Sequence, residues 1–207
     1  MQITCIKKTK RGMNAIYIDG EYKASIDSET LVKSRWKVGT SLDYDDFSQV
    51  ITMSEDYRAK EKAMRLISFR SHSKKELKDK IKRSINEESA EKAVNKLESL
   101  GLVDDESFCL MYAKEMFFRK KFAVSRVKYE LAQKGISREL ADKIIEEINP
   151  DAREQLSELL QGKYRGKFND EKNRRRTIAS LQRLGYKWED IKNVMYQECD
   201  SMVEDDF

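Results

Sequence analysis

The chain has 207 residues, of which 38% are charged and 39% are hydrophobic, and its formal net charge is +4. This length is sufficient for one large domain or two small ones, and the composition is typical of a helical protein with a charged surface. The small net charge does not by itself indicate a nucleic-acid ligand. The longest apolar run, 108–113, is too short for a membrane helix and no signal-peptide pattern occurs, so we expect a soluble, cytoplasmic protein.

Residues that usually carry chemistry are few and scattered. Cys5, Cys109 and Cys199 lie far apart without a C-x-x-C pattern, which argues against a disulfide framework or a zinc site and favours a reducing cytosol. The single histidine, His72, lies between two serines in a basic stretch, and its context does not indicate a Ser-His-Asp site. Glycine-rich nucleotide-binding patterns are absent. The sequence therefore predicts a non-catalytic protein without a cofactor or metal.

The N-terminal residues predict a β-hairpin. Segments 13–18 and 21–26 flank Asp19-Gly20, which is a strong signal for a two-residue hairpin loop. That loop predicts three cross-strand pairs on one side of the ribbon, namely Tyr17 with Tyr22, Ala15 with Ala24, and Met13 with Ile26.

Further elements are expected around this hairpin. Residues 2–6 could add a third strand, and segments 30–36 and 44–51 each predict a short helix. Because an isolated hairpin is only marginally stable in water, it must pack on another element. We therefore expect a small β-rich segment over residues 1–56.

From about Arg58 onward the pattern is helical and repeats every 50 residues. The corresponding positions are Ile81, Leu131 and Leu181, then Ile85, Gly135 and Gly185, and then Val94, Ile144 and Val194. A repeat of this length predicts stacked supersecondary units. Each unit is interpreted as three helices, with the first helices at 58–69, 106–119 and 152–161. The predicted fold is mostly α: three tandem three-helix units in an elongated, curved helical repeat, spanning 57–103, 104–149 and 150–200 and followed by an acidic tail at 201–207.

Helix-start signals support this division. Ser73 and Glu76 form a capping-box pattern, and Pro150 cannot continue the preceding helix. The predicted N-caps of later helices are Asn86, Ser137 and Asp151.

The turn at 97–108 (LESLGLVDDESF) is interpreted as the joint between the first two units. Gly101 is expected to adopt positive φ after a helix end, and Leu102 and Val103 are expected to be apolar anchors. An acidic trio then begins the next helix, where negative charge is favourable, and we prefer this capping role to metal binding. The residues assigned a structural role are Gly101, Leu102, Asp104, Asp105 and Phe108. The helix that follows is apolar at nine of eleven positions over 108–118, so we expect it to be buried on more than one side.

Positive charge gathers in the second helix of each unit, whereas the third helices are more acidic. Segment 70–83 has seven cations and two anions, 114–138 has eight and two, and 163–187 has nine and two. Such helices could bind phosphates or an acidic protein groove, or could simply be solvated faces. The candidate partner-binding residues are Arg70, Lys74, Lys78, Arg119, Lys120, Lys121, Arg126, Lys128, Lys172, Arg174, Arg175 and Arg176. Nearby aromatic residues could stack on bases, but their helical spacing favours core positions for Phe117, Phe118, Phe122, Tyr186 and Trp188.

Four segments resemble a known family: 68–77 (SFRSHSKKEL), 97–108, 129–136 (YELAQKGI) and 181–186 (LQRLGY). They are similar to the RecX proteins, which are bacterial modulators of the RecA recombinase, and the similarity extends over about residues 58–198. The sequence departs from the family at 122–124, where Gly-Pro is frequent, and the N-terminal β segment is found only in some members.

The resemblance implies a non-enzymatic regulator that lies in the groove of the RecA–single-stranded DNA filament. It would restrain the recombinase, ATPase and coprotease activities of RecA, and so act in DNA repair and the SOS response. We expect a monomer whose partner is that filament, with weak direct contact to DNA in addition. Because basic helices serve both purposes, a helical module that binds DNA or RNA directly is the alternative, and a passive helical scaffold is a third possibility.

Overall fold

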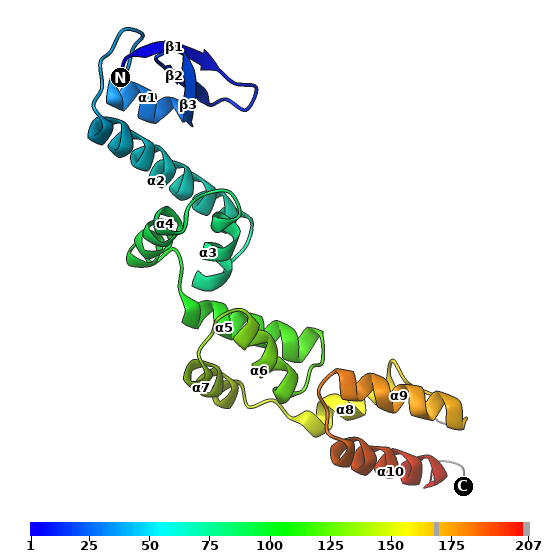
Figure 1. The fold of residues 1–207 in the computed structure, drawn as a ribbon. Helices are drawn as coiled ribbons and strands as arrows, with labels where there is room; N and C mark the ends of the chain where they lie inside the picture. The colour runs from blue at the N-terminus through cyan, green and yellow to red at the C-terminus, as the bar shows by residue number, and fades with distance from the viewer. Residues whose placement is uncertain (168–169, 205–207) are drawn as a thin grey trace. The chain divides into compact units, whose positions relative to one another are not determined.

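The computed structural model describes residues 1–167 and 170–204 and is mostly helical, with a small sheet at the N-terminus (Figure 1). This confirms the predicted fold class. Two compact units divide the chain, one spanning Met1–Asp104 and the other beginning at Asp105. The elongated, curved arrangement stays a prediction, as does the division at 56/57, 103/104, 149/150 and 200/201. In the described part of the chain, no helix combines the length and apolarity needed to cross a bilayer.

The N-terminal sheet contains three antiparallel strands in the order β1-β2-β3, namely β1 (Ile3–Lys8), β2 (Asn14–Ile18) and β3 (Glu21–Ile26). Asp19 (φ 49°) and Gly20 (φ 86°) form the loop between β2 and β3. Positive φ at both central residues is what a two-residue hairpin loop with the right twist requires. The predicted hairpin and the predicted third strand are both confirmed.

The predicted register of this hairpin is correct for only one pair. Tyr17 faces Tyr22, but a β-bulge follows, so that Ile16 faces Ala24 and Asn14 faces Ile26. The pairs Ala15–Ala24 and Met13–Ile26 are therefore wrong. The extra residue turns Ile26 onto the face of β2 that carries the fully buried Ile16 and Ile18. Burial of these isoleucines accounts for the shift, which the loop length alone does not reveal.

A buried aspartate joins the sheet to the helices. Helix α1 (Ser28–Ser34) begins after Asp27, whose Oδ1 accepts a hydrogen bond from the Thr30 amide at 2.8 Å. Its Oδ2 accepts another at 2.8 Å from the hydroxyl of Ser54 in α2 (Tyr44–Phe69). Burial alone would raise the pKa of Asp27, but the hydrogen bonds from Thr30 and Ser54 outweigh it and hold that pKa below its usual range.

The two helices predicted at 44–51 and 58–69 are a single helix of 26 residues, α2. No glycine or proline lies between the two predicted segments to end the helix, so it continues from the sheet into the first helical unit. The predicted boundary at residues 56/57 falls inside this helix.

The second half of α2 packs with α3 (Lys74–Lys82) and α4 (Glu87–Ser99). Their core consists of Ala59, Ala63, Leu77, Ile81, Ile85, Ala90, Ala93, Val94, Leu97 and Val103. The predicted N-caps are confirmed, since Ser73 accepts a hydrogen bond from the Glu76 amide (3.1 Å) and Asn86 accepts one from the Ser89 amide (2.7 Å).

Helix α4 ends in a Schellman motif at Gly101. This residue has φ +69°, and its amide donates to the carbonyl of Glu98 (2.8 Å) while the Leu102 amide donates to that of Leu97 (2.9 Å). The predicted backbone of the joint is thus confirmed. Val103 is buried as expected, but the side chain of Leu102 is 50% exposed, so its role as a buried anchor is wrong.

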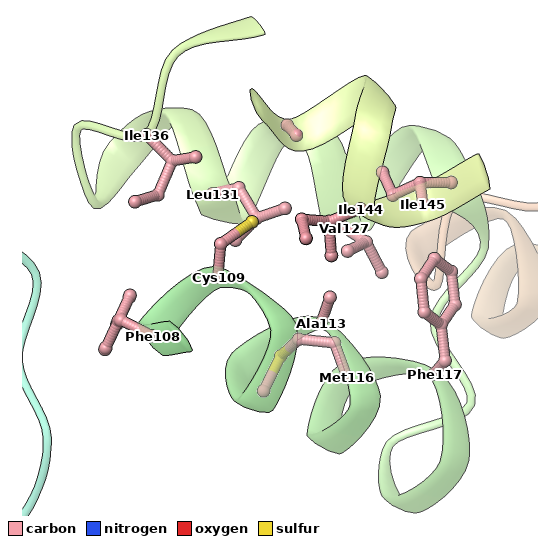
Figure 2. Packing of buried hydrophobic residues seen from close by; sticks show 11 residues of the cluster. Phe108, Cys109, Ala113, Met116, Phe117, Val127, Leu131, Ile136, Ile144 and Ile145 are labelled. Carbon is pink, nitrogen blue, oxygen red and sulfur yellow. The ribbon is translucent and has the colours of Figure 1, made fainter. Parts of the chain in front are cut away.

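The next three helices form a second three-helix group, shown in Figure 2: α5 (Asp105–Lys114) with the π-helical segment η1 (Glu115–Arg119), α6 (Val124–Gln133) and α7 (Arg138–Ile148). Asp104 directly precedes α5, as predicted, and Phe108 is buried. The helix is not enclosed on more than one side, because Met111 and Phe118 are 49% and 54% exposed. Its buried residues lie along one stripe that includes Cys109, Ala113 and Phe117.

A third group is formed by α8 (Ala152–Gln161), α9 (Glu171–Arg183) and α10 (Trp188–Glu204). Asp151 caps α8 as predicted, accepting hydrogen bonds from the Arg153 and Glu154 amides at 2.8 and 3.0 Å. Helices α6 and α9 end in the same Schellman motif, at Gly135 and Gly185. Part of the predicted tail, residues 205–207, lies outside the described residues.

Among the aromatic residues expected in the core, three are not buried there. Phe117 and Tyr186 are buried as predicted, whereas Phe122 is half-buried and both Phe118 and Trp188 are largely exposed. The helical spacing placed these residues near the apolar stripe, but within the described part of the chain the neighbouring elements leave Phe118 and Trp188 partly uncovered.

Candidate functional site

The basic helix α3 packs beside the acidic helix α4, and this arrangement pairs most of its charges. Lys74 lies 2.9 Å from Glu98, and Lys78 lies 3.0 Å from Glu91. A second carboxylate, that of Glu87, lies 3.3 Å from Lys78 and 3.0 Å from the Nζ of Lys82. The hydrogen bonds that Lys78 donates to the carboxylates of Glu91 and Glu87 raise its pKa. Charges that are segregated along the sequence are thus neighbours in space.

The side chain of Arg70 is also paired with a carboxylate of the same chain. Its guanidinium forms a bidentate pair with Glu76, at 3.1 Å (Nη1–Oε2) and 2.6 Å (Nη2–Oε1). Pairs with one half-exposed partner, such as Arg70 here, contribute only about 0–1 kcal/mol to stability. They nevertheless lower the positive charge that this part of the first unit offers to a partner.

In the second group, most predicted cations also have a carboxylate partner. Lys128 lies 2.6 Å from Asp142, Arg126 lies 2.6 Å from Glu130, and Arg119 pairs with Glu115 one turn away. Lys120 forms no ion pair within the described residues, and its Nζ lies 5.8 Å from the centroid of the Phe122 ring.

Lys121 connects the α5–α7 group to the α8–α10 group. It has positive φ (53°), its ammonium pairs with Glu158 of α8, and its carbonyl accepts a hydrogen bond from the Tyr186 hydroxyl at 3.0 Å. Burial raises the pKa of Tyr186, and the charge of Glu158 adds to that effect. These contacts give Lys121 a structural role in the fold.

A hollow of about 500 Å³ lies beside this connection. Its lining residues are Ser125, Arg126, Tyr129, Gln182, Arg183 and Gly185. The guanidinium of Arg126 lies 5.2 Å from the Tyr129 ring centroid and 5.8 Å from that of Phe122, and its Nε is buried without a hydrogen-bond partner among the described residues. Sequence reasoning missed Tyr129 and Arg183, although Tyr129 is three residues from Arg126 and so shares its helix face.

Helix α9 carries the least compensated charges among the predicted residues. Lys172, Arg174 and Arg176 are exposed and form no ion pair with the described side chains of residues 1–167 and 170–196, whereas Arg175 lies 2.9 Å from Glu171. Lys172 and Arg174 also occupy the first turns of the helix, where its dipole disfavours positive charge. These three cations are therefore the candidate residues of α9 whose charge is not offset by a described carboxylate.

The remaining chemistry-bearing residues do not form a site. His72 is buried, and its Nδ1 lies 2.8 Å from the carbonyl oxygen of Arg70 while its Nε2 lies 2.8 Å from the Nζ of Lys80. Burial raises the pKa of the Cys109 thiol to about 11, with the charges of Asp105 and Glu106 adding to the effect. Within the described residues, no three His, Cys, Asp or Glu side chains are grouped as metal ligands would be.

The helical units also match known proteins. Residues 59–97 match the model for the first three-helix domain of RecX, and residues 104–144 match the model for the second. The regulatory protein RecX of Caldanaerobacter subterraneus subsp. tengcongensis is 27% identical over 191 residues, which cover 92% of this chain and 95% of that protein. The regulatory protein RecX of Clostridium tetani is 26% identical over 196 residues, which cover 91% of this chain and 89% of that protein.

Solved structures share the fold. A crystal structure of regulatory protein RecX aligns with a TM-score of 0.60 at 22% identity, over 93% of this chain and 98% of that one. The crystal structure of RecX from Lactobacillus salivarius aligns with a TM-score of 0.55 at 23% identity, over 70% of this chain and 97% of that one. Both family domains coincide with observed three-helix groups, and the matched relatives extend over nearly the whole chain, so the chain belongs to the RecX family of regulatory proteins.

Proposed function

We propose that this protein binds the RecA–single-stranded DNA filament and restrains the recombinase, ATPase and coprotease activities of RecA. The observation that carries the proposal is the match to both RecX three-helix domains, since the matched relatives are named regulatory proteins. The protein acts without catalysis, as a cytoplasmic monomer, in DNA repair, recombination and the SOS response.

Helix α9 is the proposed centre of the contact. Lys172, Arg174 and Arg176 have no carboxylate partner among the described side chains of residues 1–167 and 170–196, so a filament that binds them breaks no ion pair with those residues. The three candidate cations of the first unit, Arg70, Lys74 and Lys78, must by contrast first leave Glu76, Glu98 and Glu91. The predicted partner-binding surface extended over all three units. We now propose that the partner binds mainly at α9, and that Lys120 contributes one further cation.

The test is ATP hydrolysis by RecA on single-stranded DNA, with this protein titrated in at fixed salt. The parent protein should slow hydrolysis, and the triple variant Lys172→Glu, Arg174→Glu, Arg176→Glu should need at least tenfold more protein for half inhibition. Loss of close charge contacts typically weakens binding by about 1–3 kcal/mol each, so a tenfold loss is a low threshold.

The control removes the same number of cations where each is paired, by Lys74→Gln, Lys78→Gln and Lys128→Gln. This variant should inhibit like the parent protein. If the parent does not slow hydrolysis at stoichiometric amounts, the proposed function is wrong. If the α9 variant inhibits as well as the control, the contact lies elsewhere.

A second candidate is a helical module that binds DNA or RNA by itself. The hollow beside Arg126 favours it, because its lining combines two arginines with the aromatic ring of Tyr129, and single-stranded nucleic acids bind to such combinations of cations and aromatic rings. Binding to bare DNA compared with RecA-coated DNA at physiological salt separates the two candidates.

A further inference from the structure

One face of α2 carries a row of cations that the dense basic runs of the sequence do not include. Arg58, Lys62 and Arg65 follow one another at spacings of four and three residues, which places them along one side of the helix. Together with the connection between α3 and α4 they border a hollow of about 280 Å³. Its lining is completed by Tyr57, Glu61, Ser84 and Ile85.

Lys62 is the centre of this cluster, which we call the α2 cation cluster: Arg58, Lys62, Arg65 and Arg83. Its ammonium donates to the carbonyl of Ile81 at 3.2 Å and to the Ser84 hydroxyl at 2.7 Å. Burial lowers the pKa of Lys62, and the charges of the three arginines lower it further. The fold thus holds four positive charges close together although burial and mutual repulsion disfavour the charged form of Lys62.

These cations differ from the others in the same unit. Lys74, Lys78 and Lys82 each face a glutamate, but none of the four cluster members forms an ion pair within the described residues. The one carboxylate lining the hollow, that of Glu61, is not paired with them either. Two guanidinium groups and one ammonium line the hollow, and the charge of Arg83 also acts on that ammonium. Cations grouped in this way without a paired carboxylate are suited to a polyanion that comes from outside the chain.

We propose that the α2 cation cluster binds phosphate groups of a single-stranded DNA backbone. The proposal deepens the proposed function, because it rests on the DNA strand that the RecA filament carries. Guanidinium groups bind phosphate oxygens through two parallel hydrogen bonds, and the Ser84 hydroxyl can donate one more. The rise per residue places successive cations about 6 Å and about 4.5 Å apart along the axis of α2, so more than one phosphate can be met.

A DNA backbone suits this face better than an acidic protein segment does. A polynucleotide presents one charge per nucleotide in an unbroken row, and its binding is favoured by the release of counterions. An acidic peptide would have to fix several long side chains to meet the same cations, and each would lose conformational entropy.

The test measures binding without RecA, so it is independent of the inhibition assay. A fluorescently labelled oligo-dT strand is titrated with the full chain, and its anisotropy is followed at several salt concentrations. The test variant is Arg58→Gln with Arg65→Gln, which keeps the structural hydrogen bonds of Lys62. The control is Lys37→Gln with Lys60→Gln, two exposed cations of the same unit that lie outside the hollow.

The test variant should bind the strand at least tenfold more weakly than the parent protein at low salt. Its slope of log affinity against log salt should be smaller by about 1.4, since each lost phosphate contact on single strands removes about 0.7. The control should change the affinity less than threefold. The proposal is overturned if the test variant keeps the parent's affinity and slope, if the parent does not bind the strand, or if poly-glutamate of equal charge competes as well as unlabelled oligo-dT.

Discussion

The glycines that end α4 and α9 allow a matched comparison of backbone strain with close packing. Both Gly101 (φ +69°) and Gly185 (φ +96°) lie in the left-handed region and end a helix in the same motif. An added Cβ at Gly101 would meet nothing within 4 Å. At Gly185 it would lie 2.7 Å from the Cβ of Arg126 and 3.0 Å from its backbone nitrogen, closer than packed atoms allow.

Alanine at Gly101 should therefore cost about 1–2 kcal/mol, the usual penalty for this conformation. Alanine at Gly185 should cost the same amount plus about 1–3 kcal/mol for overpacking against α6. The alanine at Gly185 should also disturb two nearby hydrogen bonds between the start of α6 and the end of α9. One runs from the Ala123 amide to the Leu184 carbonyl (2.9 Å), and the other from the Ser125 hydroxyl to the Gly185 carbonyl (2.7 Å).

Urea titration followed by circular dichroism measures the total loss of stability. Because a chain of several units need not unfold in one step, hydrogen exchange of the Ala123 amide is measured alongside. Exchange should accelerate in Gly185→Ala and remain at the parent rate in Gly101→Ala. Equal losses of stability in the two variants, with the Ala123 amide equally protected, would show that α6 and the end of α9 are not in close contact.

Three further predictions concern single groups. Burial holds the pKa of His72 below its usual 6.5, so the folded state favours the neutral imidazole. The free energy of unfolding should therefore fall as the pH drops from 7 to 5.5. Urea titration should show a smaller fall for the variant His72→Gln. Cys109 should resist alkylation in the folded protein at pH 8 while the half-buried Cys5 is labelled, as peptide mass spectrometry can show. Replacing Lys172 and Arg174 by Gln should raise stability by about 0.3–1 kcal/mol each and still weaken RecA inhibition; a loss of stability would refute the dipole argument.

Local signals in the sequence were sufficient for most of the helical fold. The N-caps Ser73, Asn86, Ser137 and Asp151 and the positive φ of Gly101 each depend on a few neighbouring residues, and all were predicted correctly. The 50-residue repeat then indicated how many three-helix groups to expect. The bulge in the hairpin depends on which isoleucines reach the core, and no local pattern contains that information.

The candidate surface was harder to predict, because it depends on which helices are neighbours. Lys78 and Glu91 are thirteen residues apart in the sequence, and only the packing of α3 beside α4 reveals that they pair. The α2 cation cluster was missed for a related reason. Arg58, Lys62 and Arg65 are separated by other residues, so a search for dense basic runs does not find them, whereas a search by helix face would.

The hydrophobic cores of this protein are built from nearly separate stretches of chain. One draws on residues 3–50, the next on 59–103 and another on 108–145, and the core of α8–α10 draws on 156–195 with Ala123 as its one earlier member. Contacts this local close short loops, which lowers the entropic barrier to folding. Each group can therefore complete its core as soon as its own last helix has left the ribosome, and Ala123 is already in place when the final three helices emerge.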